Sequence, residues 1–246
     1  MPGGKRPRVL LLQAREEPDM EAQEQACFLE RCGLPAHEMV CRNVVRDPLP
    51  VSLLQAADAL MIGGAGAFSA TQRYPWTQGV LDLVRAAADG GTPMFGSCWG
   101  HQIIAVALGG RVEYDGERAE MGCAEVRLTE AGREDPLFEG FPDRFLTNMG
   151  HHDRVTRLPP GAVELAENDS QPNQAFRLAG LPIYGTQFHS ELDAARERER
   201  LIAYREYYRN ELPSEERFQV VIDSLRDTTE VDGLLAAFLA RYAPGS

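Results

Sequence analysis

Short apolar runs alternate with amphipathic stretches through the first half of the chain. The apolar runs have the length and continuity of strands that are buried on both faces of a sheet. The stretches between them carry apolar residues at helical spacing; in the first, Ala22, Ala26, Leu29 and Cys32 share a face and Gly33 ends the helix. The predicted strands are residues 8–14, 37–44, 58–64 and 92–98, and the predicted helices are 19–33, 50–57, 75–91 and 100–110.

Strands and helices that alternate through short connections predict a parallel sheet with right-handed crossovers. From residue 111 the pattern changes to short, partly alternating runs between turn residues, which predict antiparallel strands added to that sheet. These runs are residues 111–116, 123–130, 145–150, 153–159, 163–168 and 174–180, and a last apolar strand follows at 181–189. We therefore expect an α/β fold with a mostly parallel sheet flanked by helices, an antiparallel extension and extra C-terminal helices.

The chain after residue 192 is predicted to be helical and is highly charged. Its helices are expected at 193–212, 214–227 and 231–243. We expect residues 1–246 to form a single domain in which 193–228 is a helical insertion before the last helix. Charges at this density are typical of a solvated face, so the sequence favours a decoration that covers a sheet edge or forms a dimer contact over a lid or docking surface.

Composition and charge narrow the classes of partner. The chain has 246 residues and a formal net charge of −12, and an acidic surface repels phosphate backbones and anionic lipids. No apolar run approaches the roughly 20 residues of a membrane span, and the run at 9–12 is too short for a signal peptide, so a cytoplasmic location is predicted. The five cysteines match no zinc spacing, so we expect no metal and free thiols in a reducing compartment.

A cysteine stands between glycines where the fourth predicted strand ends and a helix begins. Cys98, in PMFGSCWGHQ, would lie over the N-terminus of that helix, whose partial positive charge favours a thiolate. Gly96 and Gly100 would let strand and helix approach closely, as in the Gly-x-Ser-x-Gly elbow of α/β-hydrolases. The alternative is that Cys98 is an ordinary buried apolar residue, and this pattern by itself does not decide between the two.

A nucleophilic cysteine needs a base, and the base needs a group that orients it. His189 ends the strand 181–189, and Glu191, two residues later, can point to the same side of an extended segment. If the strands before Cys98 and His189 are parallel, both residues reach the same edge of the sheet. The sequence therefore indicates a site built from all three residues.

Acyl chemistry also needs donors for an oxyanion. The glycine-rich loop 63–66 follows the third predicted strand, and the N–H of Trp99 begins the helix after Cys98. An ordinary tight turn or a phosphate loop is the alternative for 63–66. A phosphate loop would carry a Lys-Ser or Lys-Thr pair after the glycines, and the sequence AFSATQ has none.

Taken together, four segments resemble class I glutamine amidotransferases. PMFGSCWGHQIIAVALGG is similar to their nucleophile segment, YGTQFHSE to their Tyr-Gly-x-Gln-Phe-His-Pro-Glu segment, MIGGAGAF to their oxyanion loop, and NMGHHDRV to a segment that contacts glutamine. They occur in the family's order within residues 8–192. The chain resembles a free-standing member, similar to the amidotransferase domain of GMP synthetase, and the resemblance implies a flavodoxin-like fold.

The resemblance implies that the chain hydrolyses the side-chain amide of glutamine, or another γ-glutamyl amide, without a cofactor. A cysteine would form a γ-glutamyl thioester, a histidine would move the proton, a glutamate would orient the histidine, and ammonia or an amine would leave. The implied catalytic residues are Cys98, His189 and Glu191; the implied oxyanion donors are the N–H groups of Gly64 and Trp99; and the implied glutamine contacts are Gln102, Gly150, His151 and His152.

Some positions depart from the family pattern. Ala65 replaces a proline of the oxyanion loop, and Ser190 replaces a proline between His189 and Glu191. Gly150 and His152 also differ from the segment that contacts glutamine, which leaves the identity of the amide substrate open.

Other functions remain open at this stage. Ammonia could pass to a synthetase partner, or the chain could be a self-sufficient γ-glutamyl peptide or amide hydrolase. A non-catalytic binding module on the same fold is a further alternative, although all three triad residues are present. A redox role for Cys98 is disfavoured, because relatives of that kind lack the His-x-Glu ending. The chain could also form oligomers, which the sequence does not decide.

Overall fold

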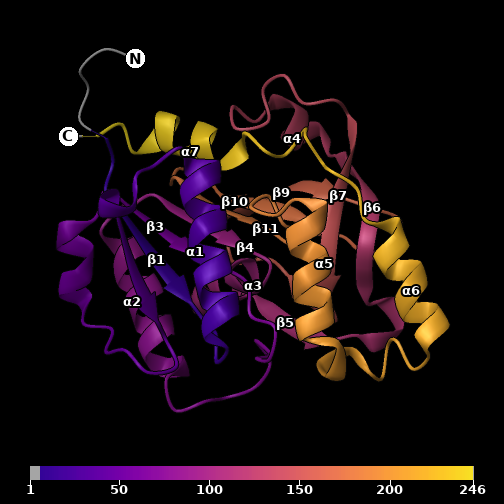
Figure 1. The fold of residues 1–246 in the computed structure, drawn as a ribbon. Coiled ribbons are helices and arrows are strands. Elements are labelled where there is room, and N and C mark those ends of the chain that lie inside the picture. The colour runs from indigo at the N-terminus through magenta and orange to yellow at the C-terminus, as the bar shows by residue number, and fades with distance from the viewer. Residues whose placement is uncertain (1–5, 246) are drawn as a thin grey trace.

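A nine-stranded sheet runs through the molecule, and helices cover both of its faces (Figure 1). The structure is a computed structural model that describes residues 6–245. The strand order is β2-β1-β3-β4-β11-β10-β9-β6-β7. The first five strands in this order are mutually parallel, and the remaining four join the sheet in antiparallel fashion.

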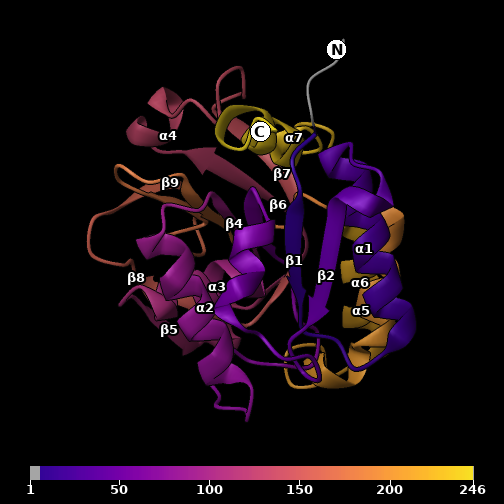
Figure 2. The same cartoon turned by 90° about the vertical axis from the view of Figure 1, so that its left-hand side faces the viewer.

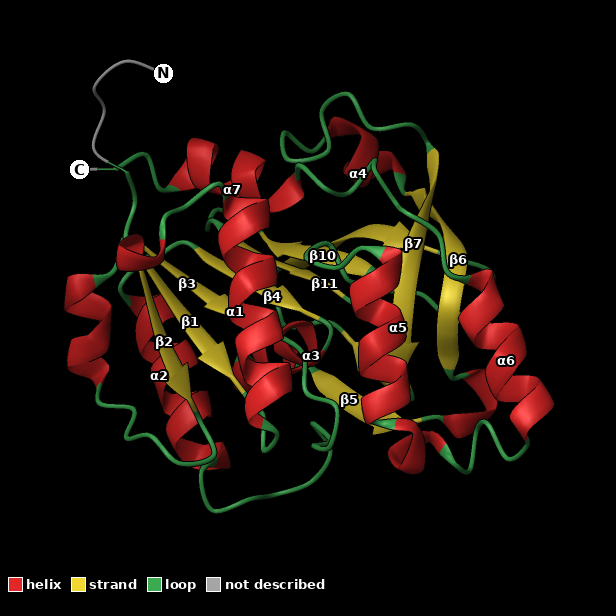
Figure 3. Ribbon diagram, in the orientation of Figure 1, coloured by secondary structure: helices red, strands yellow, loops and turns green. Residues whose placement is uncertain are grey.

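The strands and helices have the following bounds (Figure 3). The sheet contains β1 Val9–Gln13, β2 Met39–Asn43, β3 Ala59–Ile62, β4 Met94–Ser97, β6 Glu120–Leu128, β7 Arg144–His151, β9 Ala162–Glu167, β10 Ala175–Leu178 and β11 Ile183–Thr186. A separate antiparallel pair consists of β5 Arg111–Tyr114 and β8 Asp153–Arg157. The α-helices are α1 Pro18–Cys32, α2 Thr77–Asp89, α3 Trp99–Ala107, α4 Glu130–Glu134, α5 Ala194–Ala203, α6 Glu215–Ser224 and α7 Leu234–Tyr242.

Alternate residues of the central strands face two different cores. On β1, Val9 and Leu11 pack with Phe28 of α1 and with α7, whereas Leu10 and Leu12 pack with α2 and α3. Figure 2 shows α1, α5 and α6 on one side of the strands and α2 and α3 on the other. This arrangement explains the continuous apolar run, because a parallel strand covered on both faces has no solvent side.

The predicted fold class is confirmed, and the departures concern individual elements. The segment expected to be helical at 50–57 is a 3-10 helix, Val51–Ala56. In α1, Ala22 and Ala26 are exposed, and the buried face carries Glu24, Cys27 and Phe28 instead. The helix expected at 193–212 ends at Ala203 and continues as the 3-10 helix Arg205–Tyr208.

Residues 193–228, predicted to be an insertion and called the insertion below, have their own apolar cluster. Leu201, Tyr204 and Tyr208 pack there with Phe218 and Ile222 of α6. Helix α5 lies along β7 and α6 lies on β6, so the insertion covers the antiparallel end of the sheet (Figure 1). Its other side reaches the loop after β3, as described below. Within residues 6–245, no helix is both long enough and apolar enough to cross a membrane.

The turn from β4 to α3 depends on two glycines, as the sequence predicts. A Cβ atom on Gly96 would lie 2.4 Å from the backbone carbonyl carbon of Gly100, and one on Gly100 would lie 2.2 Å from the carbonyl oxygen of Ile62. Both distances are far below van der Waals contact, and the clashing atoms are backbone. The helix can therefore begin directly behind the sheet only because both side chains are absent.

Gly100→Ala is expected to destabilise the protein by about 3 kcal/mol, since the new methyl group must displace the backbone of β3. The matched control is Gly79→Ala. A Cβ atom at Gly79, inside α2, meets nothing within 4 Å, so this change is expected to stabilise by about 1 kcal/mol through helix propensity. Urea unfolding of both variants checks the pair, and equal effects would contradict the packing argument.

Candidate active site

Cys98 lies at the carboxyl edge of the sheet in a strained conformation. Its backbone has φ 51° and ψ −102°, and it immediately precedes the first residue of α3. A positive φ is unusual for a residue with a side chain and persists only where the surroundings enforce it. Here the N–H of Cys98 donates to the carbonyl of Thr186 at 2.8 Å, which ties the turn to β11. The side-chain amide of Gln187 lies 3.7 Å from the sulfur.

His189 and Glu191 form a buried pair beside Cys98. Nδ1 of His189 lies 2.7 Å from Oε1 of Glu191. The same oxygen accepts from Nη1 of Arg200 at 3.2 Å, and Oε2 accepts from the hydroxyl of Ser97 at 2.7 Å. Three donors thus fix the carboxylate, and the carboxylate in turn fixes the orientation of the imidazole.

The electrostatics of the pair favour its charged form. Burial by itself lowers the pKa of His189, but the carboxylates of Glu191 and Glu197 raise it, and a hydrogen bond with Cys98 adds to this; the result is a pKa well above the ordinary value. Burial by itself raises the pKa of Glu191, whereas His189 and Arg200 bring it well below the ordinary value. A charged imidazole therefore lies next to the sulfur of Cys98.

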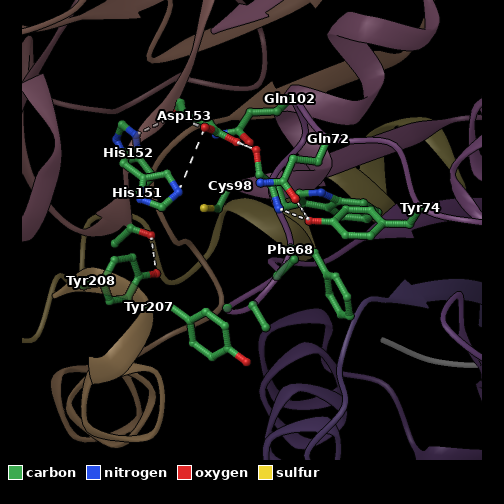
Figure 4. A pocket seen from close by; sticks show the side chains of 16 residues that line it. Phe68, Gln72, Tyr74, Cys98, Gln102, His151, His152, Asp153, Tyr207 and Tyr208 are labelled. Atoms are coloured by element: carbon green, nitrogen blue, oxygen red, sulfur yellow. Dashed lines mark hydrogen bonds and ion pairs between the residues drawn. The ribbon is translucent and has the colours of Figure 1, made fainter. Parts of the chain in front are cut away.

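A cavity of about 210 Å³ opens on one side of Cys98 (Figure 4). Gln102, Gly150, His151 and His152, the residues predicted to contact glutamine, all line it. The side-chain amide of Gln102 donates to the carbonyl of Asp153 at 2.8 Å. The loop after β3 closes the opposite wall with aromatic side chains, and Tyr207 and Tyr208 of the insertion complete the lining.

Asp153 is a residue of this cavity that the sequence analysis missed. It is buried, and its Oδ2 accepts from the hydroxyl of Ser69 and from the N–H of Ala70. Its Oδ1 has no hydrogen-bond partner among residues 6–245. The position of Asp153 next to His151 and His152 is visible in the sequence, but nothing in the sequence shows that its carboxylate is buried at the cavity. In the described part of the chain, no group of His, Cys, Asp and Glu side chains could hold a metal ion.

The two predicted oxyanion donors differ in their surroundings. The N–H of Trp99 lies in the first turn of α3, where backbone donors lack an intrahelical acceptor. The N–H of Gly64 instead donates to Oε1 of Glu24 at 3.1 Å. The buried carboxylate of Glu24 also pairs with Arg15 at 2.7 Å. Gly64 lies close to the site, since a Cβ atom there would be 3.2 Å from the ring of His189, but its donor is engaged.

A second, much smaller cavity also borders Cys98 and shares Ala65, Gly66, Gly150 and Tyr208 with the first. Its volume is about 20 Å³, and both Cys98 and His189 line it. The insertion closes it: the ring of Tyr204 packs so tightly on Gly66 that a Cβ atom there would lie 2.2 Å from it. The insertion contributes Glu197, Arg200, Leu201, Tyr204 and Tyr208.

The role favoured from sequence for the insertion is therefore incomplete. It covers the antiparallel end of the sheet as expected, but it also forms a wall of the site. A signal for this was present, because positions 197, 200, 201, 204 and 208 recur at helical spacing on one face.

A family model described as glutamine amidotransferase class-I matches residues 39–206. The chain is 35% identical over 150 residues to a subunit of the glutamine-hydrolyzing GMP synthase of Archaeoglobus fulgidus, and the match covers 61% of this chain and 75% of that protein. It is 41% identical over 102 residues to the glutamine-hydrolyzing GMP synthase of Latilactobacillus sakei, covering 42% of this chain and 19% of that protein. For the corresponding subunit from Pyrococcus abyssi the identity is 41% over 100 residues, covering 41% of this chain and 51% of the relative. The chain thus spans about half or less of the last two relatives.

Two solved structures have a similar fold. A glutamine amidotransferase from Thermotoga maritima has a TM-score of 0.72 at 22% identity, covering 97% of this chain and 99% of the other. One from Methylobacillus flagellatus has a TM-score of 0.73 at 22% identity, covering 98% of this chain and 97% of the other. The coverage includes the insertion, so the similarity of fold extends along nearly the whole chain.

Proposed function

The chain belongs to the class I glutamine amidotransferase family, and from this premise we propose that it hydrolyses the side-chain amide of glutamine through a γ-glutamyl thioester on Cys98. The observation that carries the proposal is the buried arrangement of a sulfur, an imidazole and a carboxylate at one edge of the sheet. A nucleophile, a base and a group that orients the base are the parts that acyl transfer requires.

In the first half of the reaction the Cys98 thiolate attacks the amide carbon of glutamine. The carbon–nitrogen bond breaks, and the leaving nitrogen takes the proton held by His189, so that ammonia departs. In the second half a water molecule gives a proton to His189 and adds to the thioester, which releases glutamate and restores the thiolate–imidazolium pair. Throughout, Glu191 keeps the imidazole in one tautomer and one orientation.

The 210 Å³ cavity is the proposed binding site for glutamine. Oδ1 of Asp153, which has no hydrogen-bond partner in the described chain, is suited to the α-ammonium group, because a buried carboxylate oxygen in that state gains most from a cationic donor. Gln102 holds the backbone at Asp153 in place. Trp99 is the proposed first oxyanion donor, and Gly64 becomes the second only when its N–H leaves Glu24.

The size of the second cavity supports ammonia as the leaving group. Of the two cavities beside Cys98, the smaller is the one that His189 lines, so the amine that His189 protonates leaves toward it. A cavity needs on the order of 10–15 Å³ to hold one water molecule, so about 20 Å³ has room for one ammonia. This favours glutamine over γ-glutamyl peptides.

The test is the release of glutamate from glutamine and from γ-glutamyl amides with methyl, ethyl and phenyl substituents on nitrogen. We expect turnover to be highest with glutamine and to fall steeply as the substituent grows. A preference for the larger amides would instead support a γ-glutamyl peptide or amide hydrolase. Binding of glutamine without turnover of any member would support the binding module.

The fate of the ammonia is a separate proposal. Two relatives of this chain are named as one subunit of a glutamine-hydrolyzing GMP synthase. Such a name implies that another subunit exists. We extend this implication to the present chain, and propose that a synthetase partner takes up the ammonia.

A further inference from the structure

Glu197 of α5 is a buried carboxylate that the mechanism above does not use. Glu197 is 2% exposed, and it lines the small cavity together with Cys98 and His189. Its Oε2 has no hydrogen-bond partner among residues 6–245. The neighbouring cations are engaged elsewhere, since Arg200 bonds to Glu191 and Arg15 pairs with Glu24.

The fold makes room for this carboxylate. A Cβ atom on Gly150 would lie 3.0 Å from Oε1 of Glu197 and 3.8 Å from the hydroxyl of Tyr208. Tyr208 closes the same space by donating to the carbonyl of Gly150 at 3.1 Å. The absence of a side chain at Gly150, one of the departures from the family pattern, thus allows two residues of the insertion to approach the sulfur.

A buried carboxylate oxygen such as Oε2 of Glu197 destabilises the fold unless a hydrogen-bond donor reaches it. Leaving a buried charged acceptor without a donor costs more than leaving a neutral one, because the desolvation is not offset by a bond. The cavity beside it has room for one small molecule and opens onto the reacting sulfur. In the proposed function the leaving nitrogen departs toward this cavity, and it carries N–H donors at every stage.

We propose that Glu197 binds the leaving nitrogen of the amide substrate. The inference rests on the proposed function and adds a catalytic residue to it. In the bound substrate the carboxylate of Glu197 accepts an N–H of the carboxamide, which turns the nitrogen lone pair toward His189. As the carbon–nitrogen bond breaks, the proton passes from His189 to nitrogen, and Glu197 accepts from the ammonia that forms. No proton leaves or joins Glu197 itself.

This role has a consequence for specificity. Attack by the thiolate is common to every γ-glutamyl electrophile, whereas the contact with Glu197 exists only when the leaving atom bears N–H. The diazoketone analogue of glutamine has no such atom: its diazo carbon takes a proton from His189, the thiolate forms a carbon–sulfur bond to that carbon, and dinitrogen leaves. Turnover of glutamine and alkylation of Cys98 by the diazoketone therefore separate the contact with the leaving nitrogen from the reactivity of the sulfur.

The experiment compares wild type, Glu197→Gln and Glu197→Leu, with Glu199→Gln as the matched control on the exposed side of the same helix. We expect kcat/KM for glutamine to fall by about 10-fold in Glu197→Gln, which keeps an acceptor oxygen, and by about 100-fold in Glu197→Leu. Alkylation of Cys98 by the diazoketone is expected to fall much less than turnover in the two Glu197 variants, because Glu197 also raises the pKa of His189 but meets no leaving nitrogen in this reagent. Alkylation that persists also shows that the site remains folded.

Two results would overturn the inference while leaving the proposed function intact. One is unchanged turnover in both Glu197 variants. The other is an equal loss of turnover and of alkylation, which would mean that Glu197 acts only through His189 or through packing. If wild type itself releases no glutamate from glutamine, the proposed function fails and the inference fails with it.

Discussion

Cys98→Ala is expected to abolish glutamate release from glutamine, with a fall of at least about 10⁴-fold in kcat, because the variant lacks the sulfur that forms the thioester. The fold should be unaffected, since the exchange removes one atom from a residue that is 6% exposed. Release of glutamate is measured by coupled oxidation, and labelling by the diazoketone analogue should disappear in the same variant.

The control for this variant is Cys123→Ala. Cys123 lies on β6, away from the cavities that Cys98 lines, and its backbone N–H donates to the hydroxyl of Ser224. Its replacement should leave turnover and labelling unchanged. Equal turnover of wild type and Cys98→Ala would refute the enzymatic role of the site. Loss of turnover in Cys123→Ala would contradict the assignment of Cys98 as the nucleophile.

Glu191→Gln should lower kcat by about 10³–10⁴-fold, as expected when a triad carboxylate becomes an amide. The amide has one acceptor oxygen in place of two, so its NH₂ group must face Ser97 or His189. The imidazole then loses its fixed tautomer, and the pKa of His189 loses the largest contribution that raises it. Glu125→Gln, at an exposed position of β6, is the control and should retain full activity.

The stability of the same variant gives a second measurement with a defined sign. The folded-state pKa of Glu191 lies below the value of about 4.3 for the unfolded chain. Its contribution to stability is therefore complete above that pH and is lost as the pH falls toward the folded-state pKa. We expect the free energy of unfolding of wild type to exceed that of Glu191→Gln most near neutral pH, and the difference to shrink in acid. If the difference in free energy of unfolding between the two proteins grew as the pH falls, Glu191 would not be a charged carboxylate in the folded state.

The order of strands and helices, and the meeting of Cys98 with His189 and Glu191, could be predicted from sequence because each rests on a local pattern. Strand runs, glycines at a close approach and a His-x-Glu ending all act within a few residues of one another. The parallel pairing of β4 and β11 then brings Cys98 and His189 to one edge without any further information. The domain organisation of the chain and the catalytic roles of these residues stay predictions.

The buried carboxylates around the triad, Glu24 and Glu197, could not be predicted in the same way. Glu24 and Glu197 are charged residues on helices, and charged positions on a helix are normally solvated. Glu24 is buried against Arg15 and against Arg200 of α5, and Glu197 is buried against Gly150 of β7; such neighbours are set by the packing of whole elements. The predicted face of α1 was wrong in its first half for this reason: an apolar pattern points to Ala22 and Ala26, whereas the buried turn carries Glu24. The other two predicted positions, Leu29 and Cys32, do pack in the core.

Cys98 carries the sulfur of the candidate site on a backbone conformation that is unfavourable for a residue with a side chain. Its positive φ is a state that glycine adopts freely and that a side chain resists. A change at this residue that relaxes the turn would make the folded state more favourable while removing the sulfur. Selection for thermal stability alone would therefore tend to replace Cys98, the proposed nucleophile, and engineering of this protein must screen for turnover and for stability together.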